Sequence, residues 1–199
     1  MNSYHHGALA EAMVDEALRE VRDVGPDDVS LRRIATTLGV SPSAAYNHFG
    51  DKDALLRQVG ECGHNDLDDR MAAAVAKHRG VSDKAAVARF RALGEAYITF
   101  AVEDPNLFRL TFGPLCFMTM EESVASGPFQ RLSDALDELD TRGLLREGGR
   151  ENLDIATWST VHGMSLLILE GALPAEAAGA VLDTIAQLVI SPRAKPPKH

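Results

Sequence analysis

The feature that most constrains this chain is a pair of short helical patterns, joined by a glycine, between residues 30 and 49. Ser30 can cap the free backbone N–H groups at the start of the first helix. Gly39 can adopt the left-handed conformation that ends this helix, so the chain is expected to reverse direction within a few residues. The apolar residues between them recur at helical spacing and predict one buried stripe: Leu31, Ile34, Ala35 and Leu38.

The second helix of the pair has a start suited to a nucleic-acid groove. Ser41 is a second cap, and Pro42 occupies the first helical position, where a missing N–H is tolerated. Residues 43–45 are small and let this helix end approach base edges, while residues 46–48 can reach bases or phosphates. Asp51 caps a third helix. Residues 30–52, called here the helix-turn-helix segment, therefore predict a DNA-binding element.

The charge balance is unfavourable for DNA binding. The net charge is −9, and residues 1–57 hold six Lys or Arg against nine Asp or Glu. Most of these carboxylates lie in residues 11–28, whereas Arg32, Arg33, His48 and Lys52 cluster within the helix-turn-helix segment. Affinity for phosphate depends on the face that presents the cations. We therefore expect weak non-specific binding and specificity confined to a short site.

Helical periodicity continues along the rest of the chain, with no strand-like alternation and no internal repeat. The sequence predicts an all-α protein. An amphipathic first helix has apolar residues from Leu9 to Val21. The expected later helices are Lys52 to about His78, Lys84–Val102, Asn106–Thr111, a helix around Glu121–Arg142 with an interruption near Gly127-Pro128, and a last pair at about Asn152–Ala172 and Pro174–Ile190, with Pro174 starting the second. The Pro-rich basic stretch 191–199 is expected to be disordered.

Length and composition set the remaining bounds. A chain of 199 residues fits one or two domains. No apolar run approaches the roughly 20 residues that span a bilayer, and the first residues lack the order of a signal peptide. Cys62 and Cys116 are too few for a disulfide framework. We therefore expect a cytoplasmic protein with reduced thiols and no membrane partner.

The N-terminal residues resemble the tetracycline-repressor (TetR) family of transcriptional regulators. The resemblance covers residues 4–57 and is carried by Tyr4-His5-His6-Gly7, by residues 29–35, by Leu38-Gly39-Val40-Ser41 and by residues 46–52. Beyond residue 57 it rests on length, helical layout and one motif. It implies a DNA-binding domain at 1–57, a C-terminal effector-binding and dimerisation domain at 58–190, and a tail at 191–199.

The resemblance and the local pattern together indicate which residues contact a double-stranded DNA operator. Tyr4 and His5 are candidates for a flexible arm that touches phosphate or the minor groove. The family touches phosphates at the positions of Tyr46, His48 and Lys52, and two such segments on a two-fold axis imply an inverted-repeat operator. The full set is Tyr4, His5, Ser30, Arg32, Arg33, Ser41, Pro42, Ser43, Ala44, Ala45, Tyr46, Asn47, His48 and Lys52.

A second motif lies in the last two predicted helices. Trp158, His162 and Gly163 are similar to the Trp-x-x-x-His-Gly signature of the C-terminal domain in one TetR subgroup. In the family these two helices of each subunit pack into a four-helix bundle, which implies a homodimer. The alternative is that their apolar stripes close the monomer's own core, and we expect some of each because both helices are apolar over a wide arc.

Aromatic and thioether side chains concentrate between residues 97 and 129, where Gly and Pro interrupt the helices. Such clusters are usually plain core, yet interrupted helices tend to leave cavities, and the family's effector pocket lies between the corresponding helices. For His162, a hydrogen-bonded core position is the favoured interpretation. We expect an apolar or aromatic small-molecule effector. The candidate ligand-binding residues are Tyr97, Phe100, Phe108, Phe112, Phe117, Met118, Met120, Phe129, Trp158 and His162.

Motifs for catalysis are missing from the sequence: there is no nucleophile elbow, phosphate-binding glycine loop or paired-carboxylate pattern. Cys62 and His64 lie two residues apart and would point to different faces of a helix, so we expect no metal site and no cofactor. The resulting hypothesis is a non-enzymatic DNA-binding repressor released by a small molecule. The alternative, which the acidic N-terminal region keeps open, is a helical ligand-binding or carrier protein whose helix-turn-helix has lost DNA affinity.

Overall fold

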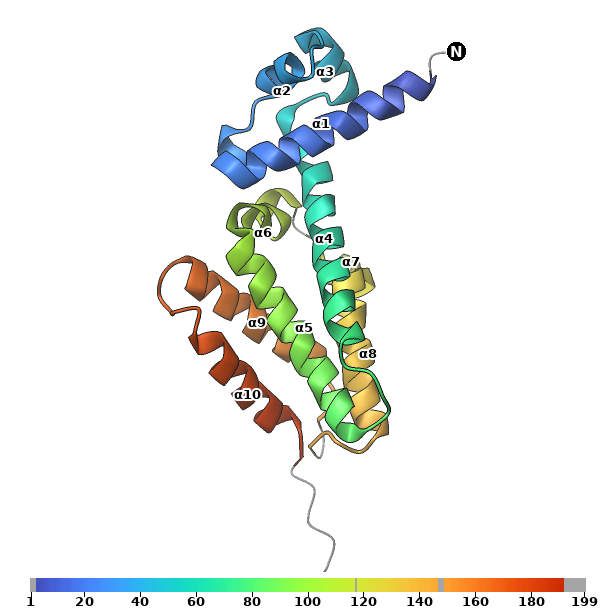
Figure 1. Ribbon diagram of the computed structural model, residues 1–199, viewed down its shortest axis with the longest axis vertical. Helices are drawn as coiled ribbons and strands as arrows, with labels where there is room; N and C mark the ends of the chain where they lie inside the picture. The colour runs from blue at the N-terminus through green and yellow to red at the C-terminus, as the bar shows by residue number, and fades with distance from the viewer. Residues whose placement is uncertain (1–2, 117, 147–148, 192–199) are drawn as a thin grey trace, which may run out of the picture. The chain divides into compact units, whose positions relative to one another are not determined.

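The computed structural model describes residues 3–116, 118–146 and 149–191, and over these residues it confirms the all-α prediction. The described part contains no strand, only an isolated bridge between Leu145 and Ile190. The helices, shown in Figure 1, are α1 (Ser3–Val24), α2 (Leu31–Thr37), α3 (Pro42–His48), α4 (Lys52–Ala76), α5 (Asp83–Glu103), α6 (Pro105–Thr111), α7 (Met120–Ala125), α8 (Gly127–Thr141), α9 (Leu153–Leu169) and α10 (Ala177–Val189), with short 3₁₀ turns η1 (Pro26–Asp28) and η2 (Pro114–Cys116).

The chain forms two compact units. The first unit comprises residues 1–66 and 104–119, and the second comprises residues 67–103 and 120–199. Helix α4 begins in the first unit and ends in the second. The sequence predicts a boundary at residue 57 between a DNA-binding and an effector-binding domain. The compact units do not test this functional division, so it stays a prediction. No helix in the described ranges combines the length and the apolar character needed to cross a membrane.

Helix starts in the first unit follow the predicted caps. The Ser30 hydroxyl accepts from the Arg33 N–H at 3.4 Å, and the Ser41 hydroxyl accepts from the Ala44 N–H at 3.2 Å. Asp51 caps α4 by accepting from the Ala54 N–H at 2.7 Å. Gly39 has a φ of 68°, which confirms the predicted left-handed end of α2. The core of this unit is apolar, with Met13, Ala17, Val21, Ile34, Ala35, Leu55, Val59, Leu107 and Phe108 fully buried.

Close contacts within the first unit depend on two glycines of α4. A Cβ added at Gly63 would overlap with the Thr111 side chain of α6, and one added at Gly60 would overlap with Cys116 Sγ of η2. Segments 105–116 can therefore pack against α4 only because these two positions lack side chains. This contact was not predicted from the sequence.

Helix α5 forms the centre of the second unit and packs against α8, α9 and α10. Its residues Leu93, Tyr97 and Phe100 are among the largest fully buried side chains. A Cβ at Gly94 would lie 2.6 Å from Leu182 Cδ2, so this glycine permits the close approach of α10. Arg89 of α5 donates to Glu138 of α8 at 2.6 Å and 3.0 Å, which ties these two helices together at their edge.

Two predicted boundaries in the second unit are wrong. Helix α9 ends at Leu169 instead of Ala172, because Gly171 takes a left-handed φ of 73° and the Ala172 N–H donates back to Leu167 O at 2.9 Å. Helix α10 begins at Ala177 instead of Pro174, because the Ala177 N–H bonds to Pro174 O in a tighter turn. The predicted interruption near residues 127–128 is confirmed, since α7 and α8 are separate helices.

Candidate nucleic-acid interface and effector cavity

The exposed face of the helix-turn-helix segment is formed mainly by α3. Ser41, Pro42, Ser43 and Asn47 are exposed, and Tyr46 has 44% of its surface exposed, which is unusual for an aromatic side chain. Ala44 and His48 are half-buried, and Ala45 is fully buried with its side chain turned into the unit. The structure thus brings most of the predicted base-facing residues onto one short helix.

The nearby cations differ in their surroundings. Arg32 of α2 is exposed. The Arg33 guanidinium instead donates to Glu20 at 2.7 Å and 2.9 Å and to Asp28 O at 2.7 Å, and Glu20 raises the pKa of this guanidinium. Lys52 Nζ donates to Asp27 O at 2.9 Å and Pro26 O at 3.3 Å. Two of the cations predicted to contact DNA are therefore bonded within the first unit.

The predicted N-terminal arm forms the start of α1. Tyr4 and His5 belong to the first turns of α1, so the backbone is helical there. Their side chains are outside the described part of the chain.

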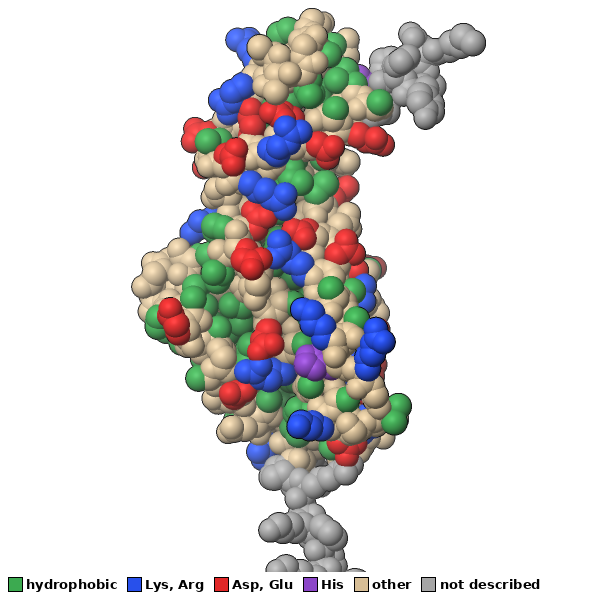
Figure 2. All heavy atoms as spheres, in the orientation of Figure 1, with side chains coloured by type: hydrophobic (Ala, Val, Ile, Leu, Met, Phe, Trp, Pro, Cys, Tyr) green, Lys and Arg blue, Asp and Glu red, His purple; other side chains and the backbone are tan. Residues whose placement is uncertain are grey.

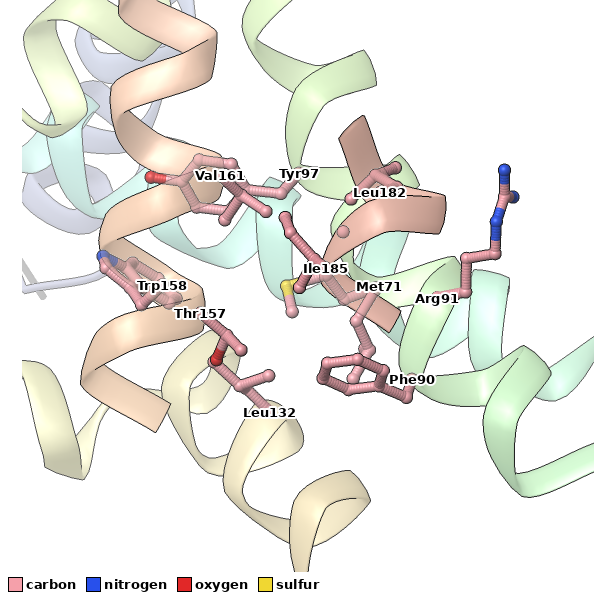
Figure 3. A pocket seen from close by; sticks show the side chains of 12 residues that line it. Met71, Phe90, Arg91, Tyr97, Leu132, Thr157, Trp158, Val161, Leu182 and Ile185 are labelled. Carbon is pink, nitrogen blue, oxygen red and sulfur yellow. The ribbon is translucent and has the colours of Figure 1, made fainter. Parts of the chain in front are cut away.

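A cavity lies in the core of the second unit. It is almost entirely apolar, and its volume is about 30 Å³, room for one or two water molecules. Figure 3 shows its side chains converging from five helices, with Arg91 pointing away from the others. The lining consists of Met71 on α4; Phe90, Arg91, Leu93, Gly94 and Tyr97 on α5; Leu132 on α8; Thr157, Trp158 and Val161 on α9; and Leu182 and Ile185 on α10.

Aromatic contacts order one side of this cavity. Trp158 meets Tyr97 edge-on with ring centroids 5.0 Å apart, and Phe129 lies 5.7 Å from Trp158. The Tyr97 hydroxyl is 2.8 Å from His162 Nδ1, so it can donate to the neutral imidazole. Burial lowers the pKa of His162 and raises that of Tyr97 well above its ordinary value, which favours this neutral pair. The hydrogen bond agrees with the structural interpretation of His162.

The other candidate ligand residues are distributed more widely. Phe100 is fully buried under the Arg70 guanidinium, 5.4 Å from its ring centroid. Phe108 and Phe112, whose ring centroids are 5.0 Å apart, and Met118 belong to the first unit. Phe117 and the side chain of Met120 fall outside the described residues. Of the eight candidates whose side chains are described, Tyr97 and Trp158 line the cavity and the other six do not.

Most cavity residues were missed as ligand candidates because each looks like ordinary core in the sequence. Phe90, Val161, Leu182 and Ile185 belong to regular apolar stripes, and only the packing of α5, α9 and α10 brings them together. Gly94 was the available signal. A glycine inside a helix is unfavourable unless another segment approaches closely, and here that segment is α10.

An apolar surface covers part of α9 and α10. Leu167 is 44% exposed and Leu188 is 68% exposed, and Ile155 and Leu166 also lie on the surface. Figure 2 shows hydrophobic side chains on the part of the second unit where these helices lie. Gly163 has open space where a Cβ would stand, so no described residue of the same chain packs there. An apolar surface of this kind is typical of a subunit interface.

Among the described residues, no cluster of three or more His, Cys, Asp or Glu side chains could hold a metal ion.

His64 on α4 has an unusual environment. Both of its ring nitrogens are buried and lack a hydrogen-bond partner, as does the Thr111 hydroxyl, and its ring meets Phe112 edge-on at 5.2 Å. Burial alone lowers the pKa of His64.

Comparison with known proteins matches both parts of the chain to one family. The model for bacterial regulatory proteins of the tetR family matches residues 13–59, and a tetracyclin repressor-like C-terminal domain matches residues 90–190, about half of the chain. The second match does not test the Trp-x-x-x-His-Gly subgroup, which stays a prediction.

Two characterised regulators are similar over the N-terminal region. The HTH-type transcriptional regulator BetI of Rhizobium meliloti (strain 1021) is 48% identical over 46 residues, which are 23% of this chain and 23% of BetI. The tetracycline repressor protein class C of Escherichia coli is 43% identical over 51 residues, 26% of this chain and 23% of that repressor. These matches span about a quarter of each relative's length.

Solved structures extend the likeness to nearly the whole chain. A protein of unknown function from Rhodococcus sp. RHA1 is 27% identical with a TM-score of 0.77, covering 96% of this chain and 100% of that one. A TetR family transcription regulator from Marinobacter aquaeolei VT8 is 21% identical with a TM-score of 0.65, covering 95% and 99%. The regulator FadR from Bacillus subtilis, solved with stearoyl-CoA, is 16% identical with a TM-score of 0.68, covering 89% and 98%. Because the last two proteins are only 21% and 16% identical to this chain, they show similarity of fold alone.

Proposed function

This chain belongs to the TetR family of bacterial transcription regulators, and we propose that it represses transcription by binding an operator and leaves that operator when a small molecule occupies its C-terminal domain. The family is one of DNA-binding regulators. The observation that carries the proposal is the capped, exposed helix α3, with Tyr46 and Asn47 on its surface, inside the region that matches the family's N-terminal model.

DNA contact is proposed for residues 1–57, chiefly through α3. Small residues at the start of α3 let the helix approach base edges, and Asn47 can bond to an exposed base. Tyr46 and His48 are proposed to contact phosphates together with Arg32, the exposed cation of α2. Tyr4 and His5 are proposed for the N-terminal arm.

An electrophoretic mobility-shift assay with the chain's own upstream intergenic DNA tests this function. We expect a shift that specific DNA competes away and that Tyr46→Ala weakens for every sequence. Arg32→Gln should reduce the slope of log affinity against log salt by about one. Val81→Ala is a matched control, because Val81 is 85% exposed on the second unit. A folded protein that binds no upstream DNA would instead favour the alternative, a carrier protein with a degenerate helix-turn-helix.

A homodimer through α9 and α10 is proposed as the active form. The exposed apolar side chains of these helices and the open space at Gly163 support a second copy of the chain at this surface. Two helix-turn-helix segments on a two-fold axis would meet an inverted repeat with half-sites about 34–36 Å apart.

An apolar or aromatic effector is proposed for the region 58–190. The cavity lining supports this class, because no carboxylate faces into it and Arg91 points away. A volume of about 30 Å³ is far below that of a drug-sized site, so an effector must displace side chains in order to enter. FadR shares the fold and was solved with stearoyl-CoA, a ligand with a long apolar chain. Nothing in this arrangement supports an enzyme, and we propose a regulator without catalytic activity.

A further inference from the structure

The 3₁₀ turn between α1 and α2 is held by two cations from different helices. Lys52 at the start of α4 donates to Asp27 O and Pro26 O, at 2.9 Å and 3.3 Å. Arg33 of α2 donates to Asp28 O at 2.7 Å. Three consecutive carbonyl oxygens of η1 are therefore joined to both helices that flank α3.

The same network continues to α1 through Glu20. Its carboxylate, of which only 12% is exposed, accepts from Arg33 Nε at 2.7 Å and from Arg33 Nη2 at 2.9 Å. It also accepts from the backbone N–H of Ser30 at 3.2 Å, and Ser30 is the residue that caps α2. One carboxylate thus fixes both the residue that caps α2 and an arginine in the first turn of that helix.

We propose that Glu20 and Arg33 are positioning residues for DNA recognition: they set the orientation of α2 on α1 and η1, and with it that of α3, and they do not themselves contact phosphate. This inference rests on the proposed DNA binding. A carboxylate near a phosphate-binding surface repels DNA, so electrostatics alone disfavours Glu20 at this position. Its three hydrogen bonds supply a structural role that outweighs this repulsion.

The hydrogen bonds between Glu20 and Arg33 have the geometry that a positioning role requires. A bidentate bond between guanidinium and carboxylate fixes both distance and direction, and a lysine ammonium cannot reproduce it. Arg33 also donates to the Asp28 carbonyl with the same guanidinium, so one planar group aligns two acceptors. Arg79, an exposed arginine of the second unit, provides a control cation outside this network.

The decisive comparison is Glu20→Gln against Glu16→Gln, measured as affinity for the upstream DNA over a range of salt concentrations. Glu16 lies one turn earlier on α1 and pairs with Arg19 of the same helix. If both carboxylates act only through their charge, both variants bind DNA as tightly as the unmodified chain or more tightly. Positioning predicts the opposite sign for Glu20→Gln alone, a loss of about tenfold.

Arg33→Lys and Arg79→Lys form the second comparison and carry the test if Glu20→Gln fails to fold. Both keep the charge, so a phosphate contact of Arg33 would survive in Arg33→Lys. Positioning predicts about tenfold weaker binding for Arg33→Lys, with an unchanged salt slope, and little change for Arg79→Lys.

Amide hydrogen exchange gives a readout that does not involve DNA. Glu20→Gln and Arg33→Lys should speed exchange in residues 30–37, whereas Glu16→Gln should not. If the unmodified chain fails to bind DNA, the proposed function fails, and hydrogen exchange still tests the network. If the unmodified chain binds, and Glu20→Gln and Arg33→Lys bind as tightly as their controls, the proposed function stands and the positioning role is overturned.

Discussion

At the scale of single residues, glycines on helix surfaces determine how closely neighbouring segments approach. Gly63 is covered by Thr111 in the first unit, and Gly94 is covered by Leu182 in the second. A glycine inside a helix can indicate such a close approach, but the sequence does not identify the residue that covers it, because that residue lies tens of positions away. The cap residues Ser30, Ser41 and Asp51 could be predicted, because each bonds to an N–H three residues ahead.

Replacing Gly63 by Ala should destabilise the first unit. The added methyl overlaps with the Thr111 side chain, while the better helix propensity of Ala offsets part of the loss, so we expect about 1–2 kcal/mol less free energy of unfolding. Urea denaturation measures this change. Thr111→Ala removes the overlapping atoms together with an unpartnered hydroxyl, so the double variant should recover most of the stability. Equal losses in the single and double variants would contradict the proposed overlap.

His64 predicts the direction of a pH effect on stability. Burial lowers its pKa in the folded state below the ordinary value of 6.5, so the unfolded chain binds more protons near that pH. The contribution of His64 to stability is therefore lost as the pH falls through 6.5 towards the lower folded pKa. His64→Leu should flatten the fall in melting temperature between about pH 7 and pH 5 relative to the unmodified chain. A parallel pH dependence in both proteins would exclude His64 as the source.

At the scale of elements, local signals located most helices, while tertiary contacts determined the rest. The interruption at residues 127–128 was predicted because Gly and Pro occur together, whereas the end of α9 depends on the left-handed Gly171. Cavity membership could not be predicted, since Phe90, Val161 and Leu182 meet only through the packing of α5, α9 and α10. Helix α9 is apolar around most of its circumference, yet only Thr157, Val161, Met164 and Ser165 are buried.

The exposed apolar face of α9 and α10 gives a prediction about assembly. Leu166→Glu and Leu188→Glu should yield folded monomers, because a buried unpaired carboxylate is strongly unfavourable at a subunit interface. Sedimentation velocity measures the change. Val81→Glu is the control, since it introduces the same charge at a residue that is 85% exposed outside these helices. Ile185 is a poorer choice because it lines the cavity. A monomeric unmodified chain at micromolar concentration would contradict the proposed dimer.

At the scale of the whole molecule, α4 is the continuous element that both compact units share. A ligand in the second unit can change DNA affinity only through its different affinities for two conformations, and the effect must be reciprocal. If an apolar compound weakens operator binding, operator DNA must weaken binding of that compound by the same factor. Trp158→Ala enlarges the cavity and should alter both affinities together. If a compound binds without changing the affinity for operator DNA, the cavity is not coupled to the DNA-binding helices.

Hydroxyl-radical footprinting of the upstream intergenic DNA tests the central claim most directly, namely that this chain recognises an operator as a two-fold dimer through α3. The account predicts two protected patches on one face of the duplex, related by an inverted repeat and centred about one helical turn, 34–36 Å, or a multiple of it apart. Asn47→Ala should lose or change this pattern while the protein stays folded. A folded, dimeric chain that protects no discrete site, or protects DNA uniformly, would contradict the account.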